Sequence, residues 1–322
     1  MKAKIYDYKI YFYTFLALIL TAIILTFPAR CLSLALNGLN LWFEKMIPTL
    51  FPFMVLSGII IRMNLTGSFV KILNPVLGRI FRLRRPCLYG IVIGFLCGFP
   101  MGAHVAAQLY EQKQISKEEA SLLLAFCNNI GPVYFLSFVL PALSLQQVFP
   151  FLFGMYGLPF LYGLFLRYMV YGHDIDNGYE KLNGNFPVRP APNLLTALDE
   201  SVFQSLFSIA KLGGYMVFFN LLFVIPGLTA DFLSLPANLS RFITGSAGCL
   251  LEITGGIGII QDCAPYLVLC ILPFGGLSCI AQTYSMIKNT DLSVNEYVMH
   301  KMILTAITVF YYLLLVELSF LP

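Results

Sequence analysis

The chain has 322 residues, of which 58% are hydrophobic and only 11% are charged, and its formal net charge is +4. An ordinary soluble domain carries about a quarter charged residues, so this composition excludes a soluble globular domain and predicts an all-α, polytopic membrane protein. The basic residues stand where membrane topology would place them, so the net charge indicates no nucleic-acid partner.

Six apolar stretches are long enough to cross about 30 Å of hydrocarbon. These predicted spans are 10–27, 47–62, 118–141, 148–168, 202–225 and 297–320. The first follows a basic N-terminus, as a signal peptide would. It lacks a small-x-small cleavage site and exceeds a typical h-region, so we interpret it as a retained span. Less regular apolar pieces lie between the spans, at 66–83, 87–110, 240–256 and 264–287.

The distribution of positive charge predicts the orientation. With a cytoplasmic N-terminus, 14 of the 20 Lys and Arg residues fall on the cytoplasmic side, as the positive-inside rule requires. This assignment places Lys301 at the outer side of the membrane, and Lys211 lies within a span. The hydrophilic linker 171–193 then lies in the cytoplasm, and the protein is expected to be integral to a membrane.

Segment 87–110 is predicted to enter the membrane and return on the same side. Basic residues bracket it at both ends, and each arm of about 12 residues is too short to span the bilayer. The segment therefore suits a re-entrant hairpin with its tip at "CGFPMG", where Gly98, Pro100 and Gly102 permit the reversal. After the hairpin, Ser116 and Glu119 have the spacing of a helix capping box.

The two halves of the chain resemble each other in order and pattern. "GAHVAAQLY" (102–110) aligns with "GLSCIAQTY" (276–284), which pairs Gln108 with Gln282, and "MIPTLFPFMV" aligns with "SIAKLGGYMV". Halves with an odd number of membrane crossings must lie in opposite orientations, which predicts an inverted repeat with two re-entrant hairpins around a central solute. The predicted units are an N-terminal span 1–30, a first repeat 40–145, a connecting span 146–170, the linker 171–193 and a second repeat 194–322.

The sequence "FCNNIGP" interrupts the third predicted span. A helix broken there frees carbonyl and N–H groups, and irregular backbone at membrane depth is tolerated where it lines a polar cavity or is buried in protein. Asn128, Asn129 and Gly131 are therefore candidate ligands of a cation or solute. The alternative is a proline kink whose asparagines join neighbouring helices.

Glycine-rich tips form a second candidate constellation. We pair "GFPMG" with "LPFGGLS", which adds Gly275, Gly276 and Ser278 to the candidate solute site, because glycine lets the backbone approach a ligand. The alternative is that these glycines only permit close packing of helices.

Glu252, in "LLEITGGIGII", is an ionisable residue inside an apolar run, and such a residue is a functional candidate by default. With Thr254 it is expected to bind a coupling Na⁺ or H⁺, or to hydrogen-bond a solute. The alternative is a structural ion pair with Lys211, itself a candidate solute ligand. No resident cofactor or metal is expected, because the three histidines are scattered and the cysteines form no C-x-x-C pair.

At "GFLCGFPMGAHVAAQLYEQKQISKEEASLLLAFCNNIGP" (94–132), "LLEITGGI" and "PFGGLS", the chain resembles the nucleoside-recognition (Gate) domain membrane proteins of spore-forming bacteria. The resemblance covers about residues 40–320. It implies distant kinship to concentrative nucleoside transporters, with re-entrant hairpins and broken helices around a central site. It also implies a role in sporulation and dipicolinate accumulation.

These features predict a secondary transporter or facilitator for a small polar, anionic solute. Two alternatives stay open, namely a cation-coupled nucleoside transporter and a non-transporting membrane assembly protein of sporulation. The expected partners are the lipid bilayer and the small solute, and whether the chain forms a homo-oligomer is left open. An enzyme is not expected, because no Ser-His or paired-Asp arrangement is present.

Overall fold

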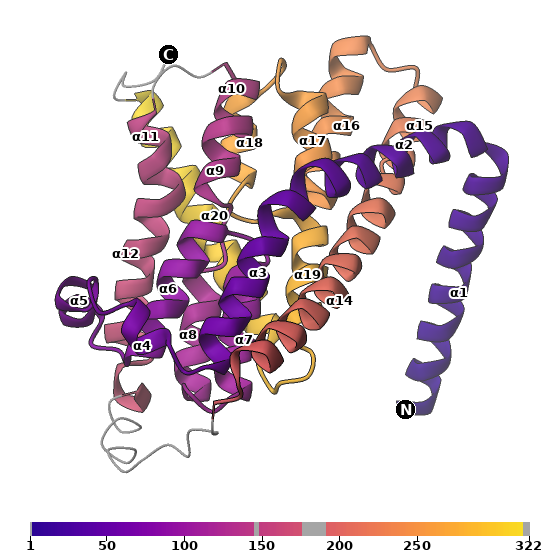
Figure 1. The fold of residues 1–322 in the computed structure, drawn as a ribbon. Coiled ribbons are helices and arrows are strands. Elements are labelled where there is room, and N and C mark those ends of the chain that lie inside the picture. The colour runs from indigo at the N-terminus through magenta and orange to yellow at the C-terminus, as the bar shows by residue number, and fades with distance from the viewer. Residues whose placement is uncertain (1, 145–147, 176–190, 318–322) are drawn as a thin grey trace.

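The computed structural model describes residues 2–144, 148–175 and 191–317, with side chains from residue 9 onward. Every regular element in these ranges is a helix, which confirms the all-α prediction (Figure 1). In chain order, with η for π-helical segments, they are α1 (Lys2–Thr26), α2 (Pro28–Leu41), η1 (Trp42–Met46), α3 (Ile47–Arg62), α4 (Thr66–Phe69), η2 (Asn74–Gly78), α5 (Arg79–Phe81), α6 (Arg85–Cys97), α7 (Met101–Glu111), α8 (Lys117–Phe126), α9 (Pro132–Tyr134), η3 (Phe135–Val139), α10 (Leu140–Ala142), α11 (Phe149–Leu152), η4 (Phe153–Gly157), α12 (Leu158–Phe165), η5 (Leu166–Val170), α14 (Leu194–Leu221), α15 (Val224–Phe232), α16 (Ala237–Leu251), α17 (Ile253–Ile260), α18 (Pro265–Ile271), α19 (Gly276–Ile287) and α20 (Val294–Glu317).

Six helical stretches of the described chain are long and apolar enough to cross a membrane, as predicted. They are Lys9–Thr26, Pro28–Arg62, Phe149–Val170, Leu194–Phe232, Pro265–Ile287 and Val294–Glu317. Their number is the predicted number, but one of the six is a different segment of the chain. The predicted span 118–141 is divided by an irregular segment into α8 and the α9–η3–α10 helix, and the sixth candidate is instead Pro265–Ile287.

The first helix lies apart from the rest of the molecule. None of the Lys9–Thr26 window is buried, and α1 stands away from the helical bundle (Figure 1). The predicted linker 171–193 falls largely at residues 176–190, outside the described residues, as do the last five residues of the predicted second repeat.

A first helical hairpin is formed by α6 and α7, where the sequence predicted one. The two helices pack against each other, and the chain reverses between Cys97 and Met101. Gly98 has a φ of +77°, a conformation that strongly favours glycine, and the backbone of Gly131 lies where its Cβ would be. The tip therefore requires glycine for both the turn and the close approach.

A second helical hairpin is formed by α16 and α17, which corrects the expectation of a hairpin at 264–287. These two helices pack closely, and the reversal occurs at Glu252, whose backbone is extended (φ −145°, ψ 113°). Segment 265–287 instead consists of α18 and α19, interrupted at 272–275 where Gly275 and Gly276 both have positive φ. The turn occurs at Glu252 because its carboxylate can cap the new helix, whereas the glycines only interrupt a span.

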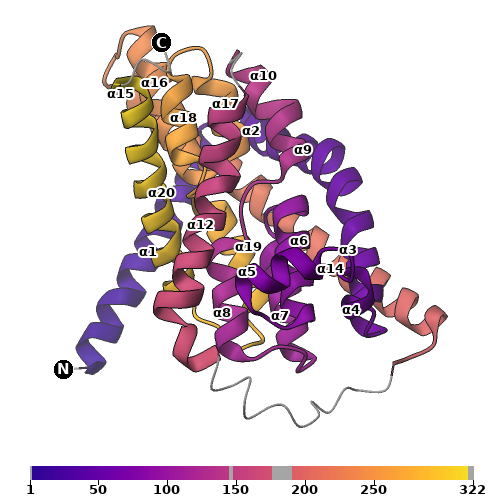
Figure 2. The same ribbon diagram turned by 90° about the vertical axis from the view of Figure 1, so that its left-hand side faces the viewer.

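Each hairpin tip fits the interruption in the span that follows it. A Cβ on Gly102 would lie 2.5 Å from the Cys127 carbonyl oxygen in the first break, and a Cβ on Gly276 in the second break would lie 3.0 Å from the Cys249 carbonyl oxygen of the second tip. The two hairpins lie at opposite ends of the bundle in both views (Figures 1 and 2). The structural partner of "GFPMG" is therefore "LLEITGG" and not "LPFGGLS", and entry of the hairpins into a membrane stays a prediction.

Candidate functional site

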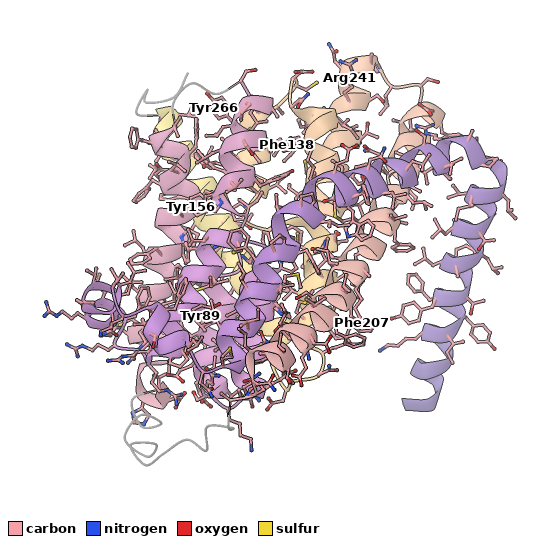
Figure 3. All side chains as sticks on the ribbon, in the orientation of Figure 1. Tyr89, Phe138, Tyr156, Phe207, Arg241 and Tyr266 are labelled. Carbon is pink, nitrogen blue, oxygen red and sulfur yellow. The ribbon has the colours of Figure 1, made fainter. Side chains whose placement is uncertain are left out.

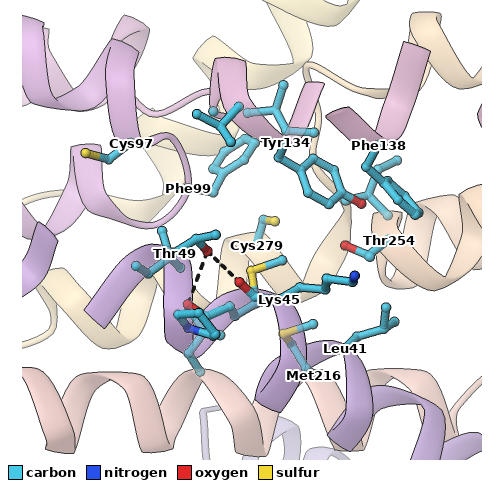
Figure 4. Close-up of a pocket in the computed structure, with 18 of the residues that line it drawn as sticks. Leu41, Lys45, Thr49, Cys97, Phe99, Tyr134, Phe138, Met216, Thr254 and Cys279 are labelled. Atoms are coloured by element: carbon cyan, nitrogen blue, oxygen red, sulfur yellow. Dashed lines mark hydrogen bonds between the residues drawn. The ribbon is translucent and has the colours of Figure 1, made fainter. Parts of the chain in front are cut away.

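A cavity of about 500 Å³ lies where the two hairpin tips meet α3 and the first broken span. Phe99, Tyr134 and Phe138 line one side of it, and Lys45 and Thr49 line the other (Figure 4). The remaining polar lining residues are Glu44, Ser137, Glu252, Thr254 and Gln282. A largely apolar wall with a few polar groups is the usual character of a small-molecule site.

Glu252 reaches this cavity from the tip of the second hairpin and is 3% exposed. Its carboxylate accepts hydrogen bonds from the N–H groups of Thr254 (3.1 Å) and Gly255 (2.7 Å) and from the side-chain amide of Asn220 (3.3 Å). These bonds place a negative charge at the N-terminus of α17, where it is stabilised by the helix dipole and the first-turn donors.

Lys211 is not the partner of Glu252, so the ion pair that was the alternative interpretation of Glu252 is not formed. Lys211 lies on α14 with its ammonium 4.1 Å from the centre of the Phe207 ring, which faces outward from that helix (Figure 3). The Lys211 side chain does not line the cavity. A charge inside an apolar helix can be accommodated over an aromatic face as well as by an ion pair.

The side chain of Asn128, in the first break, is hydrogen-bonded to α7, α19 and α20 and does not reach the cavity. Its Oδ1 accepts from the backbone N–H of Ala103 in the first turn of α7, at 3.2 Å. Its Nδ2 donates to the hydroxyls of Thr283 on α19 (2.9 Å) and Tyr297 on α20 (3.2 Å). Asn128 is fully buried, so the geometry is that of the alternative interpretation, in which the asparagines join neighbouring helices.

Asn129 and the Asn128 carbonyl bind a lysine that was not among the predicted site residues. Lys301 on α20 is fully buried, and its ammonium donates to the Asn128 carbonyl oxygen and, at 2.9 Å, to Asn129 Oδ1. The ring of Phe99, which lines the cavity, is centred 4.8 Å from this ammonium. Lys301 is therefore separated from the cavity by one aromatic ring, and the side of the membrane on which it lies stays a prediction.

Some of the remaining predicted site residues line the cavity, and others are buried in contacts between helices. The cavity is lined by Gly131, Glu252, Thr254 and Gln282. Ser278 accepts a hydrogen bond from Gln282 at 3.0 Å, and Gly275 lies against the Phe99 ring. The predicted site residues that are buried without lining the cavity are Gly98, Pro100, Gly102, Gln108, Asn128, Asn129, Gly276 and Ser278.

Sequence reasoning missed Lys301, Phe99, Tyr134, Lys45 and Thr49. One signal was available for Lys301, because a lysine five residues into a predicted span is a functional candidate by the same rule that selected Glu252. The aromatic residues carried no local signal, since phenylalanine and tyrosine are frequent throughout this chain.

A charged cluster outside the candidate spans joins the turn after α7 to the turn after α19. Asp291 accepts hydrogen bonds from the Lys117 ammonium and the Tyr110 hydroxyl, each at 2.8 Å. The bond from Lys117, and then that from Tyr110, hold the pKa of the Asp291 carboxyl below its usual value. The first hairpin is thereby tied to the second half of the chain.

No group of three or more His, Cys, Asp or Glu side chains within the described ranges could hold a metal ion. The absence of a resident cofactor and the coupling by Na⁺ or H⁺ stay predictions. The chemistry that the cavity offers is binding, through aromatic faces, hydroxyls and a few charges.

Comparison with curated proteins finds one similar to this chain, the sporulation integral membrane protein YlbJ of Bacillus subtilis (strain 168), 31% identical over 122 residues. The match covers 38% of this chain and 30% of that protein. No protein-family model matches the chain. No solved structure matches it.

The chain is therefore a distant homologue of an integral membrane protein, and its six long apolar helices agree with that class. The resemblance to membrane proteins of spore-forming bacteria is supported at this level. Membership of the Gate-domain group and kinship to nucleoside transporters stay predictions. Only about 30% of the length of the relative is matched, so its wider properties are not transferred.

Proposed function

We propose that this protein is a secondary transporter or facilitator that moves a small, polar, anionic solute across a membrane during sporulation. The observation that carries the proposal is the fully buried Lys301, which contacts carbonyl oxygens and one wall of the cavity. Sporulation is drawn from the name of the relative. N-terminal orientation and a forespore location belong to the same proposal.

The architecture supports a transport site. Two short hairpins whose tips meet two interrupted spans give a pair of similar, oppositely directed units around one cavity. Secondary transporters bind solutes at such junctions near the bilayer midplane, because the freed backbone groups there need polar partners. In this proposal both hairpins are re-entrant.

The charge distribution supports an anion. Among the described residues, the ion pairs are Arg30–Asp231, Arg62–Glu200, Arg84–Glu119 and Lys117–Asp291, and none of them includes Lys301. A buried ammonium without a counter-charge is costly, and a bound anion lowers that cost. Glu252 is already bonded to three donors of the protein, so its charge is engaged locally.

The shape of the cavity supports a planar solute. The rings of Phe99, Tyr134 and Phe138 line one side, and a flat aromatic dicarboxylate such as dipicolinate could stack on these faces with a carboxylate directed toward Lys45, while the Lys301 charge lies behind the Phe99 ring. A volume of about 500 Å³ lies within the range of small-molecule pockets. Dipicolinate is therefore the first solute to test.

The test is flux into proteoliposomes that contain trapped Tb³⁺, whose luminescence reports entering dipicolinate. Wild type is expected to give saturable entry, and Thr254→Val to reduce it at least several-fold because this change removes a cavity hydroxyl while keeping the shape. Thr229→Val is the matched control, because Thr229 is exposed and does not line the cavity. Entry no faster than in protein-free liposomes, for dipicolinate and for other small dicarboxylates, would refute the proposal.

The two alternatives are separated by further arms of the same experiment. Competition by uridine or adenosine, together with Na⁺-dependent uptake of either, would assign a nucleoside transporter. A non-transporting assembly protein predicts that cavity variants complement a deletion strain fully, whereas shortening of linker 171–193 does not.

A further inference from the structure

We infer that the Lys301 ammonium is a tethered cation that occupies a monovalent-cation site built by the first broken span, so that no Na⁺ binds at this position in the wild-type protein. The inference concerns the coupling ion of the proposed transporter. Its binding test does not depend on transport, and only its consequence for coupling rests on the proposed function.

The site is built from oxygen atoms that the helix break releases. Asn129 donates its Nδ2 to the Phe126 carbonyl oxygen at 2.6 Å, which fixes the amide so that Oδ1 faces Lys301 at 2.9 Å. The Asn128 carbonyl oxygen is the second acceptor. Another carbonyl of the break, that of Ile130, accepts a hydrogen bond from the Tyr156 hydroxyl at 3.0 Å. The Asn128 carbonyl oxygen and Asn129 Oδ1 converge on one position, which the Lys301 ammonium fills.

The other contacts of this position also favour a cation. The Phe99 ring is centred 4.8 Å from the ammonium and the Tyr297 ring 5.7 Å, and the faces of aromatic rings attract positive charge. Within the described part of the chain no carboxylate is within ion-pair distance of Lys301. Two oxygens and two rings select a single positive charge without a counter-ion.

Covalent attachment has a consequence for coupling. Carbonyl and amide oxygens of an interrupted helix are suitable ligands for a dissociable Na⁺, which would then be transported with the solute. The Lys301 ammonium, which is covalently attached to α20, supplies the same charge but cannot dissociate from the site. The wild-type protein therefore keeps the attraction for an anion while being independent of Na⁺ at this site.

The experiment compares Lys301→Ala with Lys301→Met in detergent, with unfolding midpoints measured at constant ionic strength in NaCl or in N-methyl-D-glucamine chloride. Alanine leaves the two oxygens and an open volume, so Na⁺ is expected to raise the midpoint of this variant saturably, and ethylammonium to do the same. Methionine fills the volume without charge, and wild type has the site filled, so neither is expected to respond. Lys301→Ala/Asn129→Ala, which lacks one of the oxygens, is expected to lose most of the response.

Three results would overturn the inference. One is saturable stabilisation of wild type by Na⁺. Another is a folded Lys301→Ala variant that responds to Na⁺ no more than Lys301→Met does. The last is a Lys301→Ala variant that folds in neither Na⁺ nor ethylammonium, since a vacated cation site should be refilled by one of them. Absence of flux through wild type for dipicolinate and for other small dicarboxylates, with the expected ion responses intact, would refute the proposed function and leave this inference standing.

Discussion

Replacing Asn128 by alanine removes three hydrogen bonds at the junction of the first hairpin with α19 and α20. The side chain is fully buried and joins the Ala103 N–H to the hydroxyls of Thr283 and Tyr297. Asn128 is not among the residues that line the cavity. We therefore expect Asn128→Ala to destabilise the fold, with any loss of transport following from that.

The magnitude follows from the bonds that are lost. A buried hydrogen bond contributes about 0.6–1.5 kcal/mol, with the lower end typical of membrane helices, so three bonds correspond to about 2–4 kcal/mol of unfolding free energy. The exposed Asn238, in the first turn of α16, provides the control. Asn238→Ala should change stability by less than about 0.5 kcal/mol.

The assay is reversible unfolding in SDS, monitored by labelling of buried cysteines such as Cys87, Cys127 and Cys249 with a fluorogenic thiol reagent. Solute binding is measured in parallel on the folded fraction. If Asn128→Ala unfolds like Asn238→Ala but binds solute more weakly, the structural role is refuted and Asn128 returns to the solute site.

Three further predictions concern the packing of the tips and the ends of the hairpins. Gly98→Ala should strongly reduce the yield of folded protein, because the φ of Gly98 is +77° and a Cβ there would collide with Gly131. The control is Gly214→Ala, which has open space in mid-helix and should be neutral or stabilising by up to about 1 kcal/mol. Equal yields of the two variants would contradict the tip geometry. Glu119→Ala should lower the free energy of unfolding in SDS by about 3–5 kcal/mol, because it removes the carboxylate that pairs with the largely buried Arg84 and also removes a capping box. A decrease below about 1 kcal/mol would be inconsistent with a stabilising Arg84–Glu119 pair. The hydrogen bonds of Asp291 should stabilise the fold at a pH above the unfolded carboxyl pKa of about 3.9, and this stabilisation should be lost as the pH falls through the lowered pKa of the folded state. Asp291→Asn should therefore flatten that part of a profile of unfolding free energy against pH. An unchanged profile would exclude a contribution of Asp291 to the pH dependence of stability.

Local signals in the sequence were sufficient for the helices and for several of their ends. Apolar length predicted a polytopic helical protein, and the Ser116–Glu119 spacing predicted a capping box that the structure contains. Basic residues on both sides of 87–110 predicted the first hairpin, and Asn128 to Pro132 predicted the helix break. These features depend on a few neighbouring residues, so one sequence contains the information.

The second hairpin shows where local signals fail. Glycine at 275–276 suggested the second tip, and Glu252 was identified only as an ionisable residue in an apolar run. The structure places the reversal at Glu252, whose carboxylate satisfies two N–H groups of the following helix. At Gly275 and Gly276 the span is only interrupted.

The polar groups inside the apolar chain can be identified from the sequence, but the contacts of each group depend on how the helices pack. Asn128 and Asn129 were identified from their position in an apolar run, but their partners Thr283, Tyr297 and Lys301 lie 155 to 172 residues away. A buried polar group must find a partner, and a side chain of another helix satisfies it as well as a solute does. That choice depends on which helices pack together, because the partners come from helices far apart in the chain.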